Sequence, residues 1–168
     1  MRRRSRSAGI AVAVLMVWLG VSSAWSGTLQ GSGMSGDAES RNEAVVREFI
    51  AAWSRLDPDE LVSYFTSDGT YHNMPMAPVT GRENLRQFIA GFLVSWEKTD
   101  WEVISLVADG DLVIAERVDR TLAGGRYVEL PCVGVFEMED GRIRIWRDYF
   151  DMQTYVNAIT PVEESIPQ

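Results

Sequence analysis

The 168 residues suffice for one domain of ordinary size, and the content of 46% hydrophobic and 24% charged residues is that of a globular protein. The 24 acidic residues outnumber the 16 basic ones, and the net charge of −8 argues against nucleic-acid binding, because an acidic surface repels phosphate backbones. A single cysteine excludes an internal disulfide, and one cysteine with one histidine argues against a zinc cage, so an enzyme of this composition must work with carboxylates, arginine, tyrosine and amides.

Residues 1–38 are typical of a targeting segment followed by a flexible linker. Four arginines precede an apolar run from Ile10 to Val21, and small residues up to Ala24 follow it. This order is that of a secretory signal peptide and predicts an exported protein, either periplasmic or secreted. Two alternatives stay open. The first alternative is an uncleaved membrane anchor. The second is a misassigned start, with a cytoplasmic protein that begins at Met34.

The domain is expected over residues 39–159, with a polar tail over residues 160–168. Its first half has the pattern of three amphipathic helices, because apolar residues recur at helical spacing after each of three capping signals. The signals are Ser40 with Glu43, Asp57 with Glu60, and Thr80 with Glu83. An extended piece over residues 70–73 and a loop broken by prolines separate the second helix from the third.

The second half of the domain is predicted to be strands. The segments 101–108, 111–122, 126–138 and 142–150 are rich in β-branched and aromatic residues. The hairpin turn signals between them are Asp109-Gly110, Gly124-Gly125 and Asp140-Gly141. Helices followed by an antiparallel meander make an α+β domain, and a sheet that curls over its helices encloses a pocket.

Three groups of polar residues interrupt the apolar pattern. Strand alternation places Arg117 and Asp119 on one face, and it places Asp148 between two aromatic residues on another. Tyr71 and Asn73 also share a face in the short extended piece. A carboxylate among aromatics needs a partner, or its pKa rises. Each group also has a plainer interpretation: a salt bridge at a rim, a surface acid, and the end of a strand.

These motifs occur in an order and at a spacing that resemble the limonene-1,2-epoxide hydrolase family, over roughly residues 40–158. The motifs that carry the resemblance are Tyr71-His-Asn-Met-Pro75 with Gly81 downstream, Glu116-Arg-Val-Asp119, and Gly134-Val-Phe136 leading to Trp146-Arg-Asp-Tyr-Phe-Asp151. The resemblance implies an NTF2-like, or SnoaL-like, fold: a cone in which a curved mixed or antiparallel sheet packs on three N-terminal helices. It also implies a homodimer.

Carried over residue by residue, the resemblance implies a catalytic set of Asp148, Asp119, Arg117, Tyr71 and Asn73. Asp148 is expected to act as general base on a water that Tyr71 and Asn73 hold, and Asp119 as general acid toward the epoxide oxygen. Arg117 is expected to lie between the two carboxylates and to fix their geometry. Ring strain supplies driving force, so no metal, cofactor or covalent intermediate is expected.

The substrate is expected to be a small apolar epoxide. The expected pocket walls are Trp146, Phe150, Leu130 and Cys132, together with apolar residues of the helices. Wall positions, including Cys132, differ from the family pattern, which bears on the substrate rather than on the reaction. Two rival functions stay open. One is a different enzyme of the same fold, such as a polyketide cyclase or ketosteroid isomerase, and the other is a non-catalytic lipid or small-molecule binder.

We predict that the mature protein begins near Trp25–Gly27 when it is expressed with its full leader in its native host. The arginine cluster, the short apolar run and Ala24 together make a cleavage site at this point. Mass spectrometry of the secreted protein measures the new terminus. A chain that starts at Met34 and occurs only in the cytosol would instead establish the misassigned start.

Overall fold

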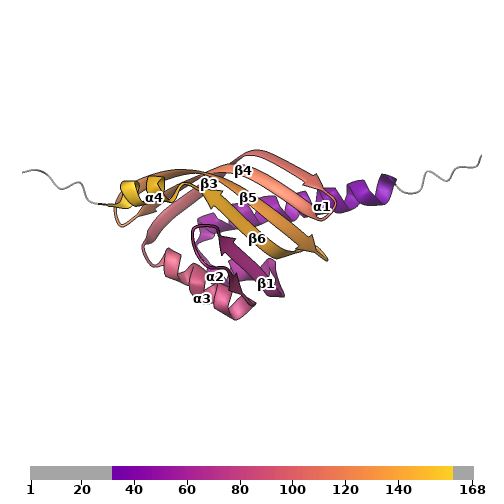
Figure 1. Ribbon diagram of the computed structural model, residues 1–168, viewed down its shortest axis with the longest axis horizontal. Helices are drawn as coiled ribbons and strands as arrows, with labels where there is room; N and C mark the ends of the chain where they lie inside the picture. The colour runs from indigo at the N-terminus through magenta and orange to yellow at the C-terminus, as the bar shows by residue number, and fades with distance from the viewer. Residues whose placement is uncertain (1–31, 161–168) are drawn as a thin grey trace, which may run out of the picture.

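The computed structural model describes residues 32–160 (Figure 1). The predicted signal peptide lies outside these residues, as does almost all of the predicted tail. In chain order the elements are α1 (Ser32–Ala52), the 3-10 turn η1 (Trp53–Arg55), α2 (Pro58–Ser63), β1 (Phe65–Asn73), β2 (Val79–Thr80), α3 (Arg82–Leu93), β3 (Trp96–Asp109), β4 (Leu112–Ala123), β5 (Arg126–Glu139), β6 (Arg142–Phe150) and α4 (Met152–Ile159). No helix among them is long and apolar enough to cross a membrane.

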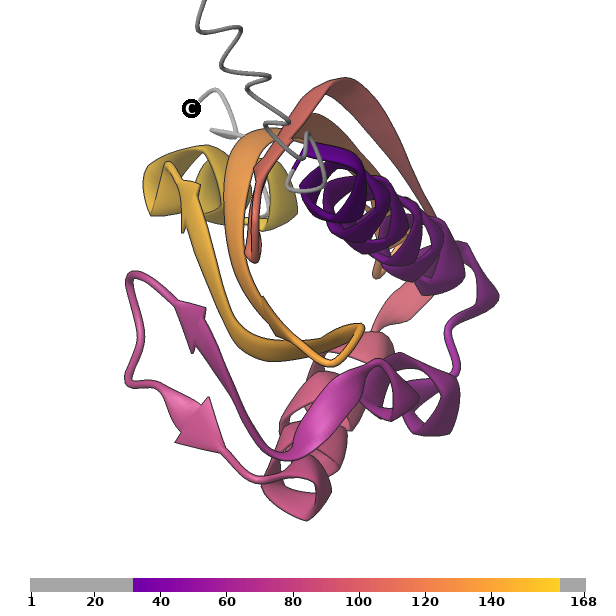
Figure 2. The ribbon, with the colours of Figure 1, turned by 90° about the vertical axis from the view of Figure 1, so that its right-hand side faces the viewer.

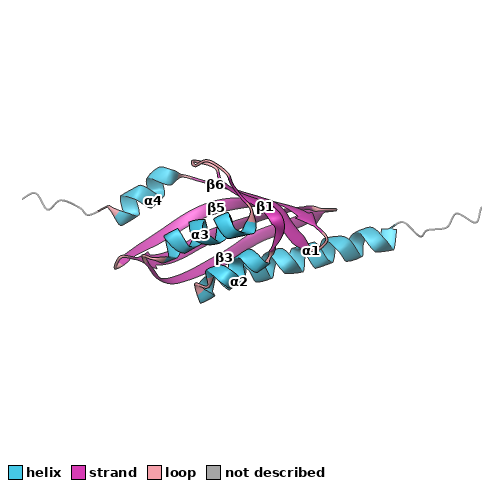
Figure 3. Cartoon of the chain, turned by 90° about the horizontal axis from the view of Figure 1, so that it is seen from below, coloured by secondary structure: helices cyan, strands magenta, loops and turns pink. Residues whose placement is uncertain are grey.

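One six-stranded sheet, in the order β2-β1-β6-β5-β4-β3, forms the body of the fold. All neighbouring strands are antiparallel except β1 and β6, which run parallel, so the sheet is mixed. The sheet is curved, and α1 lies along its concave side (Figure 2). The helices α1, α2 and α3 lie on one side of the sheet, while α4 stands apart at its end (Figure 3). The predicted α+β architecture is therefore confirmed.

The core lies between the concave face of the sheet and the three helices. Phe49 of α1 is fully buried at its centre and makes edge-on ring contacts with five other aromatic side chains. These are Trp53, Tyr64, Phe65, Phe136 and Trp146, at centroid distances of 6.2, 5.5, 5.6, 6.1 and 5.0 Å. Aromatic side chains from α1, β1, β5 and β6 thus fix how the helix sits in the curved sheet.

The hairpin turns form where the sequence predicted them. Gly110, Gly124 and Gly141 all have positive φ angles of 56° to 72°, and Asp140 has a φ of 49°. A primed turn needs this left-handed backbone to match the twist of the two strands it joins. Tight turns at these positions fix the register of β3 through β6, and so determine which side chains face inward.

Only one of the three predicted helix starts is correct. The Asp57 carboxylate accepts hydrogen bonds from the backbone N–H groups of Asp59 and Glu60, and α2 begins at Pro58 as expected. Ser40 lies inside α1, which begins at Ser32, because no proline upstream stops the helix. Part of the predicted linker is therefore helical.

Thr80 does not cap the third helix, because it belongs to β2 and its hydroxyl bonds across to Thr70 at 2.9 Å. The residue that precedes α3 is Gly81, whose φ of 89° turns the chain into the helix without any side-chain cap. The sequence also left three features unpredicted: the five-residue N-terminal extensions of β1 and β3, the short strand β2, and the helix α4.

Candidate active site

Arg117 on β4 lies at the centre of a buried cluster and has no exposed surface. Its Nε and Nη2 donate to the two carboxylate oxygens of Asp119 at 2.8 and 3.2 Å. Its Nη1 and Nη2 donate to the two oxygens of Asp148 at 3.0 and 2.6 Å. One guanidinium therefore holds two carboxylates, each through a pair of charge-assisted hydrogen bonds. The plainer interpretation, an exposed salt bridge at a rim, is excluded by this burial.

The strand register brings these three residues together. Arg117 and Asp119 are two residues apart on β4 and therefore face the same side of the sheet. Asp148 lies on β6, and the strand β5 separates the two. Arg117 pairs with Cys132 on β5, while Asp148 pairs with Gly134 of the same strand. The long arginine side chain crosses β5 to reach Asp148.

Asp148 accepts two further hydrogen bonds besides those from Arg117. The indole Nε1 of Trp146 donates to Oδ1 at 2.7 Å, and the Tyr71 hydroxyl donates to Oδ2 at 3.5 Å. Trp146 is fully buried, and its ring stacks on that of Tyr71 at a centroid distance of 3.9 Å. Trp146 is not among the residues that line the cavity described below, so its predicted place on the pocket wall is wrong. Trp146 instead orients the Asp148 carboxylate through its indole N–H, from the side away from the cavity.

Asn73 ends β1 next to Asp148, with which it pairs across the parallel strands. Its side chain is 8% exposed, and its Oδ1 atom is buried without a hydrogen-bond partner in the structure. A buried amide oxygen without a partner is unfavourable, so an additional donor is expected to fill this place. A water molecule is the smallest group that supplies one.

A cavity of about 190 Å³ opens on this cluster. One end of it carries the polar residues Tyr71, Asn73, Asp119 and Asp148. The rest of its wall is largely apolar and comprises Trp53, Met76, Phe92, Trp96, Trp101, Leu130, Cys132, Phe150, Met152 and Tyr155. Of the predicted wall residues, Phe150, Leu130 and Cys132 therefore line the cavity.

The expected contribution of helix residues to the walls comes from Trp53 and Phe92, whereas sequence reasoning missed the wall residues Met76, Trp96, Trp101, Met152 and Tyr155. Met152 and Tyr155 come from α4, a helix of eight residues. The Asp151 side chain caps its N-terminus by accepting hydrogen bonds from the N–H groups of Gln153 and Thr154. Asp151, a residue type favoured at the N-cap, was the available signal for that helix. The ring centroid of Trp101 lies 4.6 Å from the Arg117 guanidinium carbon, and its ring stacks on that of Trp53. These contacts join segments far apart in the sequence, so no local pattern reveals them.

Burial sets the protonation behaviour of the cluster. It raises the pKa of Asp119 to about 6, and the nearby Asp148 charge adds to this rise, while Arg117 opposes it. Burial also raises the pKa of the Cys132 thiol and of the Tyr71 hydroxyl. The thiol and the phenol therefore stay neutral, and Asp119 carries a proton more readily than an ordinary aspartate.

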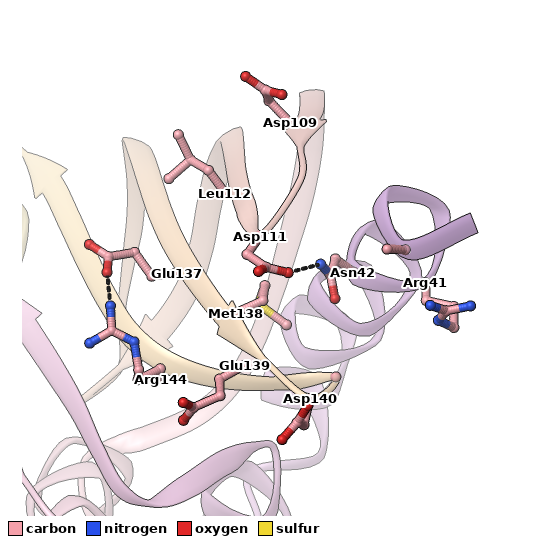
Figure 4. Close-up of a pocket in the computed structure, with 12 residues that line it drawn as sticks. Arg41, Asn42, Asp109, Asp111, Leu112, Glu137, Met138, Glu139, Asp140 and Arg144 are labelled. Atoms are coloured by element: carbon pink, nitrogen blue, oxygen red, sulfur yellow. Dashed lines mark hydrogen bonds and ion pairs between the residues drawn. The ribbon is translucent and has the colours of Figure 1, made fainter. Parts of the chain in front are cut away.

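A second hollow, at the hairpin end of the sheet, is larger, about 870 Å³, but is of another kind (Figure 4). Among its charged groups, Glu137 and Arg144 form an ion pair. The Asn42 amide donates to Asp111 at 3.3 Å and to the Gly110 carbonyl at 3.1 Å, which ties α1 to the β3–β4 turn. Within residues 32–160 no group of three or more His, Cys, Asp or Glu side chains is placed to hold a metal ion.

The profile of the SnoaL-like domain family matches residues 46–146, most of the domain. The chain belongs to this family. It is also 31% identical over 114 residues to the epoxide hydrolase EphG of Mycobacterium tuberculosis, covering 64% of this chain and 72% of that one. The predicted resemblance to the limonene-1,2-epoxide hydrolase group is therefore confirmed, and with it the NTF2-like fold.

Solved structures of SnoaL-like proteins agree with this assignment. An LEH-like epoxide hydrolase of M. tuberculosis matches with a TM-score of 0.64 and 27% identity, over 71% of this chain and 90% of that one. The epoxide hydrolase/cyclase-like enzyme SalBIII, described for pyran ring formation in the polyether salinomycin, matches with a TM-score of 0.62 over 68% of this chain and 94% of its own. At 20% identity, SalBIII shows only that the fold is shared.

We predict that the Asp119 carboxyl titrates near pH 6 in the free protein, because burial and the Asp148 charge outweigh Arg117. Carboxyl-carbon NMR over pH 3 to 9 measures this directly, and the Asp119→Asn variant assigns the resonance. Titration near pH 4, the ordinary range of an aspartate, would mean that the pocket is wetter than the structure indicates.

Proposed function

We propose that this protein is a cofactor-independent epoxide hydrolase that adds water to an apolar epoxide and releases a vicinal diol in one acid/base-catalysed step. The observation that carries the proposal is Arg117 bridging two buried carboxylates at the polar end of an otherwise apolar cavity. Opening an epoxide with water needs a base and an acid in one place, and two carboxylates held by one cation supply both.

Asp148 takes the role of the base. Its carboxylate accepts from Arg117, Trp146 and Tyr71, which hold it in one orientation. The unpaired Oδ1 of Asn73, on the adjacent strand, offers an acceptor for a proton of the attacking water. The water oxygen forms a bond to a ring carbon while one of its protons passes to Asp148.

Asp119 takes the role of the acid. The ring C–O bond breaks as attack proceeds, and the oxygen that leaves with the electron pair takes the proton of Asp119. A pKa of about 6 makes a protonated Asp119 accessible near neutral pH. The proton gained by Asp148 must return to Asp119 before the next turnover, and Arg117 contacts both groups.

The cavity favours neutral, apolar substrates. Leu130, Phe150 and Cys132 line it close to the carboxylates. The buried guanidinium of Arg117 is already engaged by two carboxylates. An anionic group next to the epoxide would face Asp119 and Asp148 at low dielectric, where like charges repel strongly. Polyketide cyclases, ketosteroid isomerases and simple binders would not require this combination of two carboxylates, Arg117, Tyr71 and Asn73.

The protein is further proposed to be exported and to act as a homodimer. The convex face of the sheet carries exposed apolar side chains from all four long strands: Val107, Ile114, Val133 and Tyr149, with Ile104 beside them. Such a patch is unfavourable in water unless a second copy covers it. Light scattering of the unaltered protein should give a dimer, and Val133→Glu should give monomers. A monomeric unaltered protein would contradict this.

Diol formation from a panel of epoxides tests the proposed activity. Neutral cyclic epoxides are expected to be hydrolysed and epoxysuccinate is not. Asp148→Asn and Asp119→Asn should each lower the rate by about 10²–10⁴-fold or more, because they remove the base and the acid. Arg117→Lys should not restore activity, because a point charge cannot bridge two carboxylates in pairs.

The matched control for the aspartate variants is Asp100→Asn, which changes an exposed aspartate of β3 outside the cavity. It should retain the full rate. Folding of each variant is checked by thermal unfolding. Normal turnover by either folded active-site variant, or hydrolysis of the anionic epoxide alone, would reject the assignment.

A further inference from the structure

Gly134 occupies the one place where the Arg117 side chain passes over β5. It is buried near the middle of that strand and pairs with Ala115 of β4 on one side and with Asp148 of β6 on the other. Its neighbours on the same face, Cys132 and Phe136, both carry side chains into the interior. Gly134 leaves a gap between them.

The arginine fills this gap. A Cβ atom built on Gly134 would lie 2.6 Å from Nη1 of Arg117, and 2.7 and 3.0 Å from two ring carbons of Phe136. Ordinary van der Waals contact begins at 3.4 Å, so the guanidinium would have to withdraw by about 0.8 Å. The clash falls on Nη1, the same nitrogen that donates to Asp148 at 3.0 Å.

The backbone offers no escape from this clash. β5 is an interior strand, hydrogen-bonded to β4 and to β6 along its length. Its partner at Gly134 on the β6 side is Asp148 itself, so any retreat of the strand moves the carboxylate as well. The strain can therefore be relieved only by displacing Arg117, Asp148 or Phe136.

We propose that Gly134 is a positioning residue of the active site, whose missing side chain leaves the space through which Arg117 reaches Asp148. Any larger residue at position 134 would separate the Arg117 guanidinium from the Asp148 carboxylate. The side chain added there would not narrow the cavity, because neither Gly134 nor Arg117 lines it. The effect on turnover rests on the proposed function, whereas the steric relation does not.

Displacement of Arg117 would also change the charge balance at Asp119. Arg117 is the group that opposes the rise in the pKa of Asp119, through its charge and its hydrogen bonds. The other titratable groups near this carboxyl are Asp148 on β6, Cys132 on β5 and Tyr71 on β1, and Tyr155 of α4 lines the same cavity. With the cation moved away, the pKa of Asp119 should rise above 6.

Four variants test the proposal: Gly134→Ala, Phe136→Leu, the two combined, and Gly69→Ala. Phe136→Leu removes the ring carbons that would clash, so in the double variant Arg117 is the remaining group in the way. Gly69 is a second buried strand glycine, and its added Cβ would meet the Phe65 side chain and the Ile143 carbonyl at 3.0 to 3.2 Å, without touching Arg117. It controls for strain alone.

Three measurements are made on each variant: thermal unfolding, kcat and KM on a neutral epoxide, and the titration of Asp119. Gly134→Ala and the double variant are expected to lose about 10²-fold or more in kcat, since a displacement near 1 Å can have this effect, with KM little changed. The pKa of Asp119 should rise in both. Gly69→Ala should lower the melting temperature and leave the Asp119 titration unmoved.

Either of two results with folded variants would overturn the proposal. One is a double variant that matches Phe136→Leu in kcat and in the Asp119 titration, because the effect of the added methyl group would then act through Phe136. The other is Gly134→Ala with unaltered values throughout. Should the double variant not fold, replacing the whole charged set in it (Arg117→Met, Asp119→Asn and Asp148→Asn) removes the last clashing group without leaving a buried carboxylate unpaired, and is expected to restore folding. Continued failure to fold would also reject the proposal.

The two proposals can fail separately. If the unaltered protein hydrolyses no epoxide, the proposed function is wrong, but the Asp119 titration still reports whether Gly134→Ala displaces Arg117. If the unaltered protein hydrolyses epoxides and the titration is unmoved in Gly134→Ala, the activity stands and the positioning role is wrong.

Discussion

The structure depends on one fully buried guanidinium that two carboxylates share. Removing a charged side chain from water is unfavourable, and only a complete set of partners offsets this. Arg117 donates four hydrogen bonds to the carboxylates of Asp119 and Asp148, and the centroid of the Trp101 ring lies 4.6 Å from its charged carbon. A packed apolar cluster of similar volume is often at least as stable as such a triad. Stability alone therefore does not explain why these residues occupy the interior.

The same strands build both the core and the candidate active site. One part of each strand faces the core, and the part that follows along the chain faces the site. On β4 the inward side chains begin with the fully buried Val113 and Ala115 and continue with Arg117 and Asp119. On β6 they begin with Ile143 and continue to Asp148 and Phe150, which line the cavity. One end of the curved sheet is thus closed by Phe49 and its aromatic neighbours, which gives the polar end a rigid support.

The facing of the site residues could be predicted because it depends only on strand alternation. Arg117 with Asp119, and Tyr71 with Asn73, are pairs two residues apart on one strand. Turn glycines also fixed the hairpins on both sides of β4, which carries Arg117 and Asp119. Alternation cannot show whether an inward side chain reaches the cavity or is covered by other side chains. Trp146 shares a face with Asp148, yet it lies behind the carboxylate because Tyr71 and Phe136 stack on its ring. Capping signals failed at Ser40 and Thr80, where neighbouring structure overrides a local preference.

The cavity is asymmetric, and this asymmetry bears on how a substrate would lie. The unpaired Asn73 oxygen and the carboxylate pair stand at one end, while Trp53, Trp96 and Trp101 stand among the apolar walls. The indole N–H groups of these three tryptophans are buried without partners, so they are packed as hydrophobic surface rather than turned toward a polar group. An epoxide has one polar atom, and that oxygen is best accommodated where a proton donor is available, at Asp119. The hydrocarbon part then contacts the apolar walls, and the ring carbons face the space between Asp119 and the place for water beside Asn73. Orientation would thus follow from the separation of polar and apolar walls, without a charged group to grip the substrate.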